Sequence, residues 1–157
     1  MLQFDTLPVD NRLRWFLGSL NRILFDAADT DGAFGLMEQW TGAGFSPPRH
    51  VHHREDSAII VLDGELLVQR GEEEFVVSKG QTVFLPRGVP HTFLVTSSDA
   101  HFYELVTPGG FEGFHIDASD PAPSATLPPA APPDVPRLVD ALVTYGAAIV
   151  GPPMGHD

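Results

Sequence analysis

The sequence contains no cysteine, one lysine and no long apolar run. Without cysteine there are no disulfides, no thiolate chemistry and no cysteine-ligated zinc site. The single lysine, Lys79, and a formal net charge of −12 oppose binding to nucleic acid or to anionic membranes. No apolar stretch is long enough to span a bilayer, and the first residues lack the layout of a signal peptide. We therefore expect a cytoplasmic protein with a neutral or weakly polar ligand.

The composition favours strands and turns over long helices. The chain has 157 residues, enough for one domain with a real core, and it contains 15 glycines and 15 prolines. Short runs of β-branched and aromatic residues recur about every 8–12 residues over positions 14–107, which is typical of a sandwich or barrel. Asp63-Gly64 separates two such runs, and this dipeptide is a strong hairpin signal. The sequence thus predicts an all-β fold in which 59–62 pairs with 65–69.

The last third of the chain differs from the rest in composition and in the spacing of its apolar residues. Residues 119–136 are rich in proline, so we expect an extended crossing with neither helix nor strand over 120–133. Asp134 followed by Pro136 is a plausible helix start, apolar residues then recur at helical spacing, and Gly146 ends the pattern. We expect a short C-terminal helix over about 134–146 that packs on this barrel or on a partner's barrel, followed by a short strand near 148–150.

Three histidines stand where predicted strands begin. His50 and His52 are two residues apart, so their rings share one face of an extended strand, and His91 opens a later β-rich run. A first-row metal needs three or more ligands at about 2.0–2.2 Å. The pattern favours a divalent metal site over polar filling of a barrel mouth. Imidazole suits Fe, Ni, Zn, Co or Mn without choosing among them.

The spacing of these residues resembles the two motifs of the cupin family. The first motif is G, five residues, HxH, three or four residues, E, six residues and G; the second is G, five residues, PxG, two residues, H, three residues and N. The matching residues are Gly44, His50, His52, Gly64, Gly80, Pro86, Gly88 and His91, while Ser57 and Val95 stand where glutamate and asparagine are expected. The stretches 47–56 and 85–93 look most like the bacterial quercetinase-like branch.

The resemblance implies a double-stranded β-helix, or jelly roll, spanning residues 1–157 as one domain, with a bound metal and commonly a homodimer. In the quercetinase-like branch the motif glutamate binds the metal and takes a proton from the substrate hydroxyl. Glu55, which has the strand parity of Ser57, or Asp56, which fits the shorter motif spacing, could replace it. The alternative is a three-histidine face with open water positions, as among cupin dioxygenases that bind ferrous iron.

The expected lumen is apolar. Strand alternation sends Phe93 and Val95 inward with His91, and Ile59 and Val61 inward with Ser57; Phe45 or Phe84 could add an aromatic wall. Such a pocket suits an aromatic or enolic small molecule. Glu104, in the middle of an apolar strand, is either on the solvent face, which we favour, or a candidate catalytic base in the pocket. Other histidines rank lower as site residues: His53 faces away from His52, His101 is structural, and His115 and His156 lie outside the motifs.

Three functions fit these residues. The first is an O₂-dependent dioxygenase, which the resemblance implies. The second is a non-oxidative isomerase or cyclase in which the metal is a Lewis acid. The third is a binding or sensing module without catalysis. The candidate site residues are the metal ligands His50, His52 and His91 and the catalytic candidates Glu55, Ser57 and Glu104.

Overall fold

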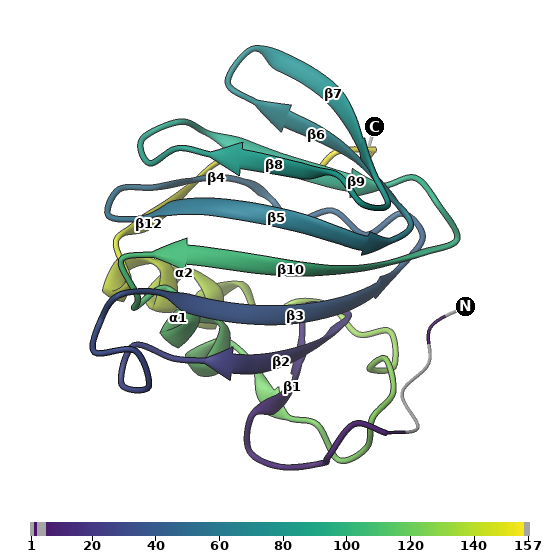
Figure 1. Ribbon diagram of the computed structural model, residues 1–157, viewed down its shortest axis with the longest axis vertical. Helices are drawn as coiled ribbons and strands as arrows, with labels where there is room; N and C mark the ends of the chain where they lie inside the picture. Colours follow the sequence, from purple (N-terminus) through teal and green to yellow (C-terminus); the bar gives the residue numbers. More distant parts are fainter. Residues whose placement is uncertain (1, 3–5, 156–157) are drawn as a thin grey trace.

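The computed structural model describes residues 2 and 6–155, and within this part of the chain it confirms the predicted all-β fold. Two antiparallel sheets dominate (Figure 1). The strands are β1 (Leu13–Phe16), β2 (Ser19–Phe25), β3 (Gly35–Gly42), β4 (Arg49–His52), β5 (Asp56–Asp63), β6 (Glu65–Arg70), β7 (Glu73–Ser78), β8 (Thr82–Leu85), β9 (His91–Val95), β10 (Asp99–Thr107), β11 (Asp120–Pro121) and β12 (Ala147–Gly151). The helices are α1 (Glu112–Asp117) and α2 (Val135–Thr144).

The larger sheet has seven strands in the order β11-β1-β2-β3-β10-β5-β8, and the smaller has five in the order β12-β4-β9-β6-β7. Figure 1 shows β5, β10, β3 and β2 side by side, with α1 and α2 next to each other at one end. On β5 every second residue is buried, beginning at Ser57 and continuing with Ile59 and Val61. The inner faces of both sheets therefore share one core, as the period-two pattern predicts.

The predicted hairpin at Asp63-Gly64 is wrong. β5 pairs with β10 and β8 in the larger sheet, whereas β6 pairs with β7 and β9 in the smaller one. Gly64 has a φ of 85°, and a Cβ there would lie 2.3 Å from the carbonyl oxygen of Asp99. The turn carries the chain from one sheet to the other, so that Ile59 and Leu66 face the same core instead of lying side by side.

The C-terminal segment, which follows the histidine motifs in the sequence, adds α2 and β12 to the fold. The Asp134 side chain caps α2 by accepting a hydrogen bond from the Arg137 amide at 3.2 Å, and Gly146, with a φ of 71°, follows the helix. The predicted helix and the final strand are thereby confirmed. The prediction of no strand over 120–133 is wrong at 120–121, where β11 pairs with β1 and extends the larger sheet. Neither helix of the described residues is long and apolar enough to traverse a bilayer.

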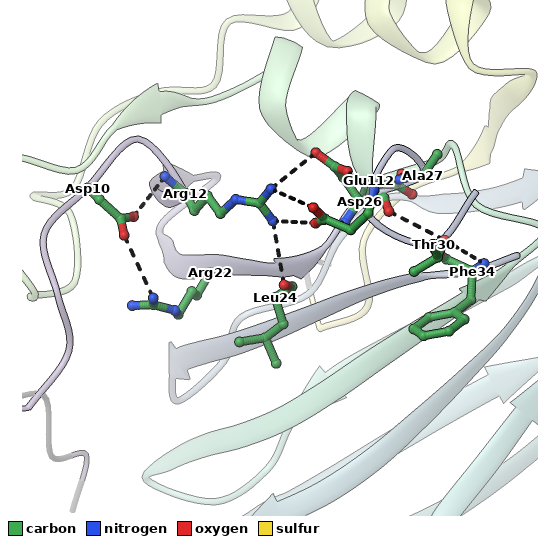
Figure 2. Close-up of polar contacts among 10 residues, drawn as sticks. Asp10, Arg12, Arg22, Leu24, Asp26, Ala27, Thr30, Phe34 and Glu112 are labelled. Carbon is green, nitrogen blue, oxygen red and sulfur yellow. Dashed lines mark hydrogen bonds and ion pairs between the residues drawn. The ribbon is translucent and has the colours of Figure 1, made fainter. Parts of the chain in front are cut away.

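Polar contacts fasten α1 and the first strands to the loop after β2. Arg12 reaches Asp29 at 2.7 Å and Asp26 at 3.5 Å, close to the buried Glu112 at the start of α1 (Figure 2). Glu112 accepts hydrogen bonds from the amides of Ala27 at 2.6 Å and Gly110 at 2.8 Å. These bonds fix the position of the six-residue helix α1, which is too short to be stable without tertiary contacts.

Candidate metal centre

The structure brings the three motif histidines together on the inner face of the smaller sheet. β4 pairs with β9 through His50 and His91, and His52 follows on the same face of β4. Their ring centroids are 4.6 to 5.2 Å apart, and one ligand atom from each ring lies within 4.8 Å of the other two. β12 pairs with the edge of β4 that faces away from β9, with Ala147 opposite His52 and Ile149 opposite His50. The tail thus holds the histidine strand in place.

Two of the histidines are oriented by backbone carbonyls. The Nδ1 of His50 lies 2.7 Å from the carbonyl oxygen of Pro48, and that of His91 lies 3.2 Å from the oxygen of Val89. A carbonyl oxygen only accepts, so each Nδ1 carries the proton and each Nε2 keeps its lone pair. Metal-binding histidines are commonly oriented in this way.

His52 is the histidine whose surroundings best fit a role as a metal ligand. Its side chain is 1% exposed, and neither ring nitrogen has a hydrogen-bond partner among the described residues. Burial, reinforced by His50 and His91, lowers the pKa of His52 to about 2, and burial lowers that of His91 to about 3. Both rings are therefore neutral at physiological pH, as metal ligands must be. The unpartnered nitrogens and the neutral donor set fit a divalent metal ion.

The two acids beside Ser57 have different environments. Asp56 lies near the surface, where it accepts hydrogen bonds from the backbone and side chain of Arg87 at 2.9 and 3.2 Å, and Arg87 lowers its pKa. The suggestion that Asp56 replaces the motif glutamate is therefore wrong. Glu55 is buried, with Oε2 4.0 Å from Nδ1 of His52, and burial raises its pKa. It lies beside a candidate ligand, at a distance too long for a hydrogen bond to that ring.

Ser57 stands inside the barrel, as its strand parity predicts. The residue is 2% exposed, and its Oγ has no hydrogen-bond partner among the described residues. Its neighbours in the register are Leu85 on β8 and Val106 on β10, both buried and apolar. A neutral hydroxyl in this position brings no negative charge to the site.

An apolar cavity of about 70 Å³ adjoins the histidines. Its lining includes His50, His91 and the predicted Phe93 and Phe45. Residues outside the sequence motifs complete it: they come from β1, from α1 and the residue before it, from α2 and from β12, and include Phe16, Phe111, Phe114, Leu138, Leu142 and Ile149. Phe84, the other suggested wall, is 54% exposed and does not line the cavity. The lining is mostly apolar and favours an apolar ligand over a charged one. An aromatic ligand would require the cavity to widen, since a cavity of ~150 Å³ holds one benzene ring.

Glu104 lines this cavity, so the preferred solvent-facing position is wrong and the alternative position in the pocket is correct. Its Oε2 accepts a hydrogen bond of 2.7 Å from the Gln39 amide. Burial raises the pKa of Glu104 to about 7, against the smaller lowering effect of that bond. A carboxyl group with this pKa exchanges protons readily near neutral pH.

Among the remaining histidines, the structure adds one to the site. His115 on α1 is 5% exposed and lines the cavity, although its position outside the motifs gave no reason to single it out. His53 is exposed, as expected. His101 stacks on Trp40 at 4.8 Å and contacts Glu38 at 2.7 Å, consistent with the expected structural role. His156 lies outside the described residues.

Comparisons with known proteins identify a family and a distant relative. A family model described as a cupin domain matches residues 35–113. Quercetin 2,3-dioxygenase of Bacillus subtilis (strain 168) is 25% identical over 113 residues, which are 72% of this chain but 34% of that curated relative, so the chain spans about a third of its length.

Solved structures agree on the fold. KdgF from Halomonas sp. has 19% identity and a TM-score of 0.56, covering 61% of this chain and 84% of KdgF. An RmlC-like cupin from Shewanella frigidimarina NCIMB 400 has 18% identity and a TM-score of 0.56, covering 72% and 99%. At these identities the likeness concerns the fold, and it confirms the predicted jelly-roll barrel.

Proposed function

This chain belongs to the cupin family, and from that premise we propose that it is a metal-dependent oxidoreductase of the dioxygenase type, acting on an aromatic or enolic small molecule. The observation that carries the proposal is the group of His50, His52 and His91, whose ligand atoms lie within 4.8 Å of one another beside an apolar cavity. The distant similarity to a quercetin 2,3-dioxygenase supports the reaction type.

The three histidines would hold the metal ion, which when bound would act as a Lewis acid that favours the deprotonated form of an enol or phenol. The apolar cavity would orient the aromatic body of the substrate and exclude water from it. Glu55, whose carboxylate lies 4.0 Å from the Nδ1 of His52, would have to approach that ring by about 1 Å to orient it through a hydrogen bond.

Glu104 would take the hydroxyl proton of the substrate. In the quercetinase-like cupins this role falls to the motif glutamate, whose place here is taken by Ser57. Glu104 lines the same cavity and, with a pKa of about 7, is a base of suitable strength near neutral pH. Replacing it with glutamine should preserve the hydrogen bond from Gln39 and remove the proton acceptor.

A non-oxidative isomerase or cyclase is the second candidate, and Glu104 is the observation that favours it. A carboxyl group that both accepts and returns a proton is sufficient, with a Lewis acid, to move a double bond without oxygen. In this reaction the substrate would retain its elemental composition, whereas a dioxygenase would add two oxygen atoms to it.

The test begins with protein purified without chelator or nickel affinity resin. Oxygen uptake and ¹⁸O₂ labelling are measured with a panel of flavonols, catechols and cyclic enols, for the wild type, Glu104→Gln and the exposed control His53→Ala. We expect two labelled oxygen atoms in the product. Turnover should be about a hundredfold or more lower in Glu104→Gln, on the order of the general-base contribution, and unchanged in His53→Ala. Isomerised product without label would establish the second candidate, and metal binding without turnover would indicate a sensing module.

We also propose that the protein is a homodimer, as the family resemblance suggests. Sedimentation equilibrium of the full chain gives the mass directly. A mass of one 17.0 kDa chain at every concentration would contradict this proposal.

A further inference from the structure

The cavity beside the histidines is smaller than an aromatic ligand. Its volume is about 70 Å³, whereas a cavity of ~150 Å³ holds one benzene ring. Part of the wall must therefore move when such a ligand binds. The hydrogen bonds of each wall element show which part is free to do so.

The strands and the loop before β4 are firmly bonded parts of the wall. The strands that contribute to the lining are paired within the two sheets. The loop is tied to β9, because the Val95 amide donates to the Phe45 carbonyl at 2.9 Å and the Thr92 hydroxyl donates to the Pro47 carbonyl at 2.6 Å. Neither part can move outward without breaking bonds between backbone groups or within the molecule.

α1 is also fixed, at both of its ends. At its start the buried Glu112 accepts a hydrogen bond of 2.6 Å from the Ala27 amide. At its end the buried Arg14 donates to the Ile116 carbonyl at 3.0 Å and to the hydroxyl and carbonyl of Ser119, both at 2.9 Å. These bonds tie α1 to β1 and to the loop after β2.

α2 is attached differently, mainly through side chains at the surface. Residues 122–134 before it contain neither helix nor strand, and Gly146, with a φ of 71°, joins it to β12. The Tyr145 hydroxyl donates to the Asp117 carboxylate at 2.8 Å. The guanidinium of Arg137 donates to three oxygens at the end of α1: the carbonyls of Asp117 and Ser119, at 2.8 and 2.7 Å, and the Asp120 carboxylate, at 3.0 Å. We call Arg137 and Tyr145 the latch.

The two faces of α2 fit a movable wall. Leu138, Ala141 and Leu142 are buried on the inner face, and both leucines line the cavity. On the outer face Val139 and Val143 are 43% and 72% exposed, so the helix has open space to move into. The Asp134 cap is bonded to the helix itself and would move with it.

We propose that α2 is a movable wall that swings outward to seat an aromatic ring in the cavity. Leu138 and Leu142 set the size of the ligand that fits without this movement, and the latch opposes it. The cost of opening the latch then lowers the apparent affinity for any larger ligand. The aromatic class of ligand rests on the proposed function, whereas the attachment of α2 does not.

Fluorobenzene is a suitable probe, because it has nearly the shape of benzene and carries no oxygen for a metal ion. Its dissociation constant is measured by ¹⁹F NMR with metal-free wild type, Arg137→Met, Leu142→Ala and the variant that carries both changes. Arg137→Met keeps an unbranched side chain and loses the donors of the latch. Leu142→Ala removes three carbon atoms from the wall and brings the cavity closer to the size that holds one ring. Val139→Ala, on the outer face, is the control.

We expect Arg137→Met to bind the probe about three- to tenfold more tightly than the wild type, on the order of one hydrogen bond. In the Leu142→Ala background the ring needs less room from α2, so Arg137→Met should change the constant little or not at all. Val139→Ala should bind like the wild type. An unchanged constant in Arg137→Met, an equal gain in both backgrounds, or failure of the wild type to bind the probe would overturn the proposal.

Distances between spin labels report the movement of α2 directly. Because the chain has no cysteine, labels at Val143→Cys and Glu72→Cys measure the distance from α2 to the turn between β6 and β7. Labels at Glu72→Cys and Lys79→Cys, on two exposed turns of the barrel, are the control pair. Fluorobenzene should change the first distance and leave the second unchanged.

A first distance that stays constant with the probe bound would overturn the proposal even if Arg137→Met did not fold. Both measurements use metal-free protein and a probe without oxygen. A chain that binds no metal or turns over no substrate would therefore contradict the proposed function and leave the movement of α2 to be decided by the probe.

Discussion

Replacing Glu104 with glutamine should make the stability of this protein less dependent on pH. Glutamine has nearly the same shape, keeps an oxygen for the Gln39 amide and cannot ionise. In the wild type, burial raises the pKa of Glu104 from 4.5 to about 7. Between these values the folded state keeps a proton that the unfolded state has lost. Wild-type stability therefore falls as the pH rises, and the contribution of the protonated form is lost by the time the pH passes 7.

The size of this change in stability follows from the pKa shift of Glu104. As the pH rises from about 5 to 8, the free energy of unfolding of the wild type should fall by about 2.5 kcal/mol relative to that of Glu104→Gln. The free energy of unfolding is measured by urea titration of both metal-free proteins at several pH values, and the difference between them is plotted against pH. Contributions from the histidines are common to both proteins and cancel in this difference.

The control is Glu72→Gln, on the exposed turn between β6 and β7, for which the difference should stay flat. A flat difference for Glu104→Gln as well would show that the carboxyl group is not desolvated by the cavity. The proton-accepting role proposed for Glu104 would then lose its physical basis.

Three further changes test other parts of the structure. Ser57→Glu should tighten metal binding by about tenfold or more by adding a charged ligand; unchanged affinity, with binding abolished in Glu55→Gln, would make Glu55 the true fourth ligand. Gly64→Ala should cost at least about 2 kcal/mol in urea unfolding, because its Cβ would meet the Asp99 carbonyl, whereas Gly80→Ala, with open space around it, should cost less. Asp134→Ala should cost about 1 kcal/mol through loss of the α2 cap; an unchanged unfolding midpoint would contradict this.

The histidine group was predictable because local rules determine it. His50 and His52 share a strand face by parity alone, and the proline and glycine residues before His91 mark the loop that returns the chain to the same sheet. The same alternation correctly placed Ser57 in the interior.

The errors arose where distant parts of the chain decide the outcome. Asp-Gly has the same local chemistry in a hairpin and in a corner between sheets, and only the packing of Gly64 against Asp99 distinguishes them. The position of Glu104 is different, because it shares its strand parity with the apolar residues Ala100, Phe102 and Val106, all of them buried. Alternation along β10 therefore already indicated the interior, and the solvent-facing prediction gave more weight to the charge of the side chain. His115 reaches the cavity because Glu112 fastens α1 to the loop after β2, a contact between residues 85 positions apart.

Metal content tests the central claim most directly. Elemental analysis is made on wild type, His91→Ala and His53→Ala, each purified without chelator or nickel resin and then dialysed against a mixture of Fe, Ni, Zn, Co and Mn salts. We expect roughly one ion per chain in the wild type and in His53→Ala, as for a single three-histidine site, and little or none in His91→Ala. A wild type that holds no metal after this loading, or a His91→Ala variant that holds as much as the wild type, would contradict the proposed metal centre.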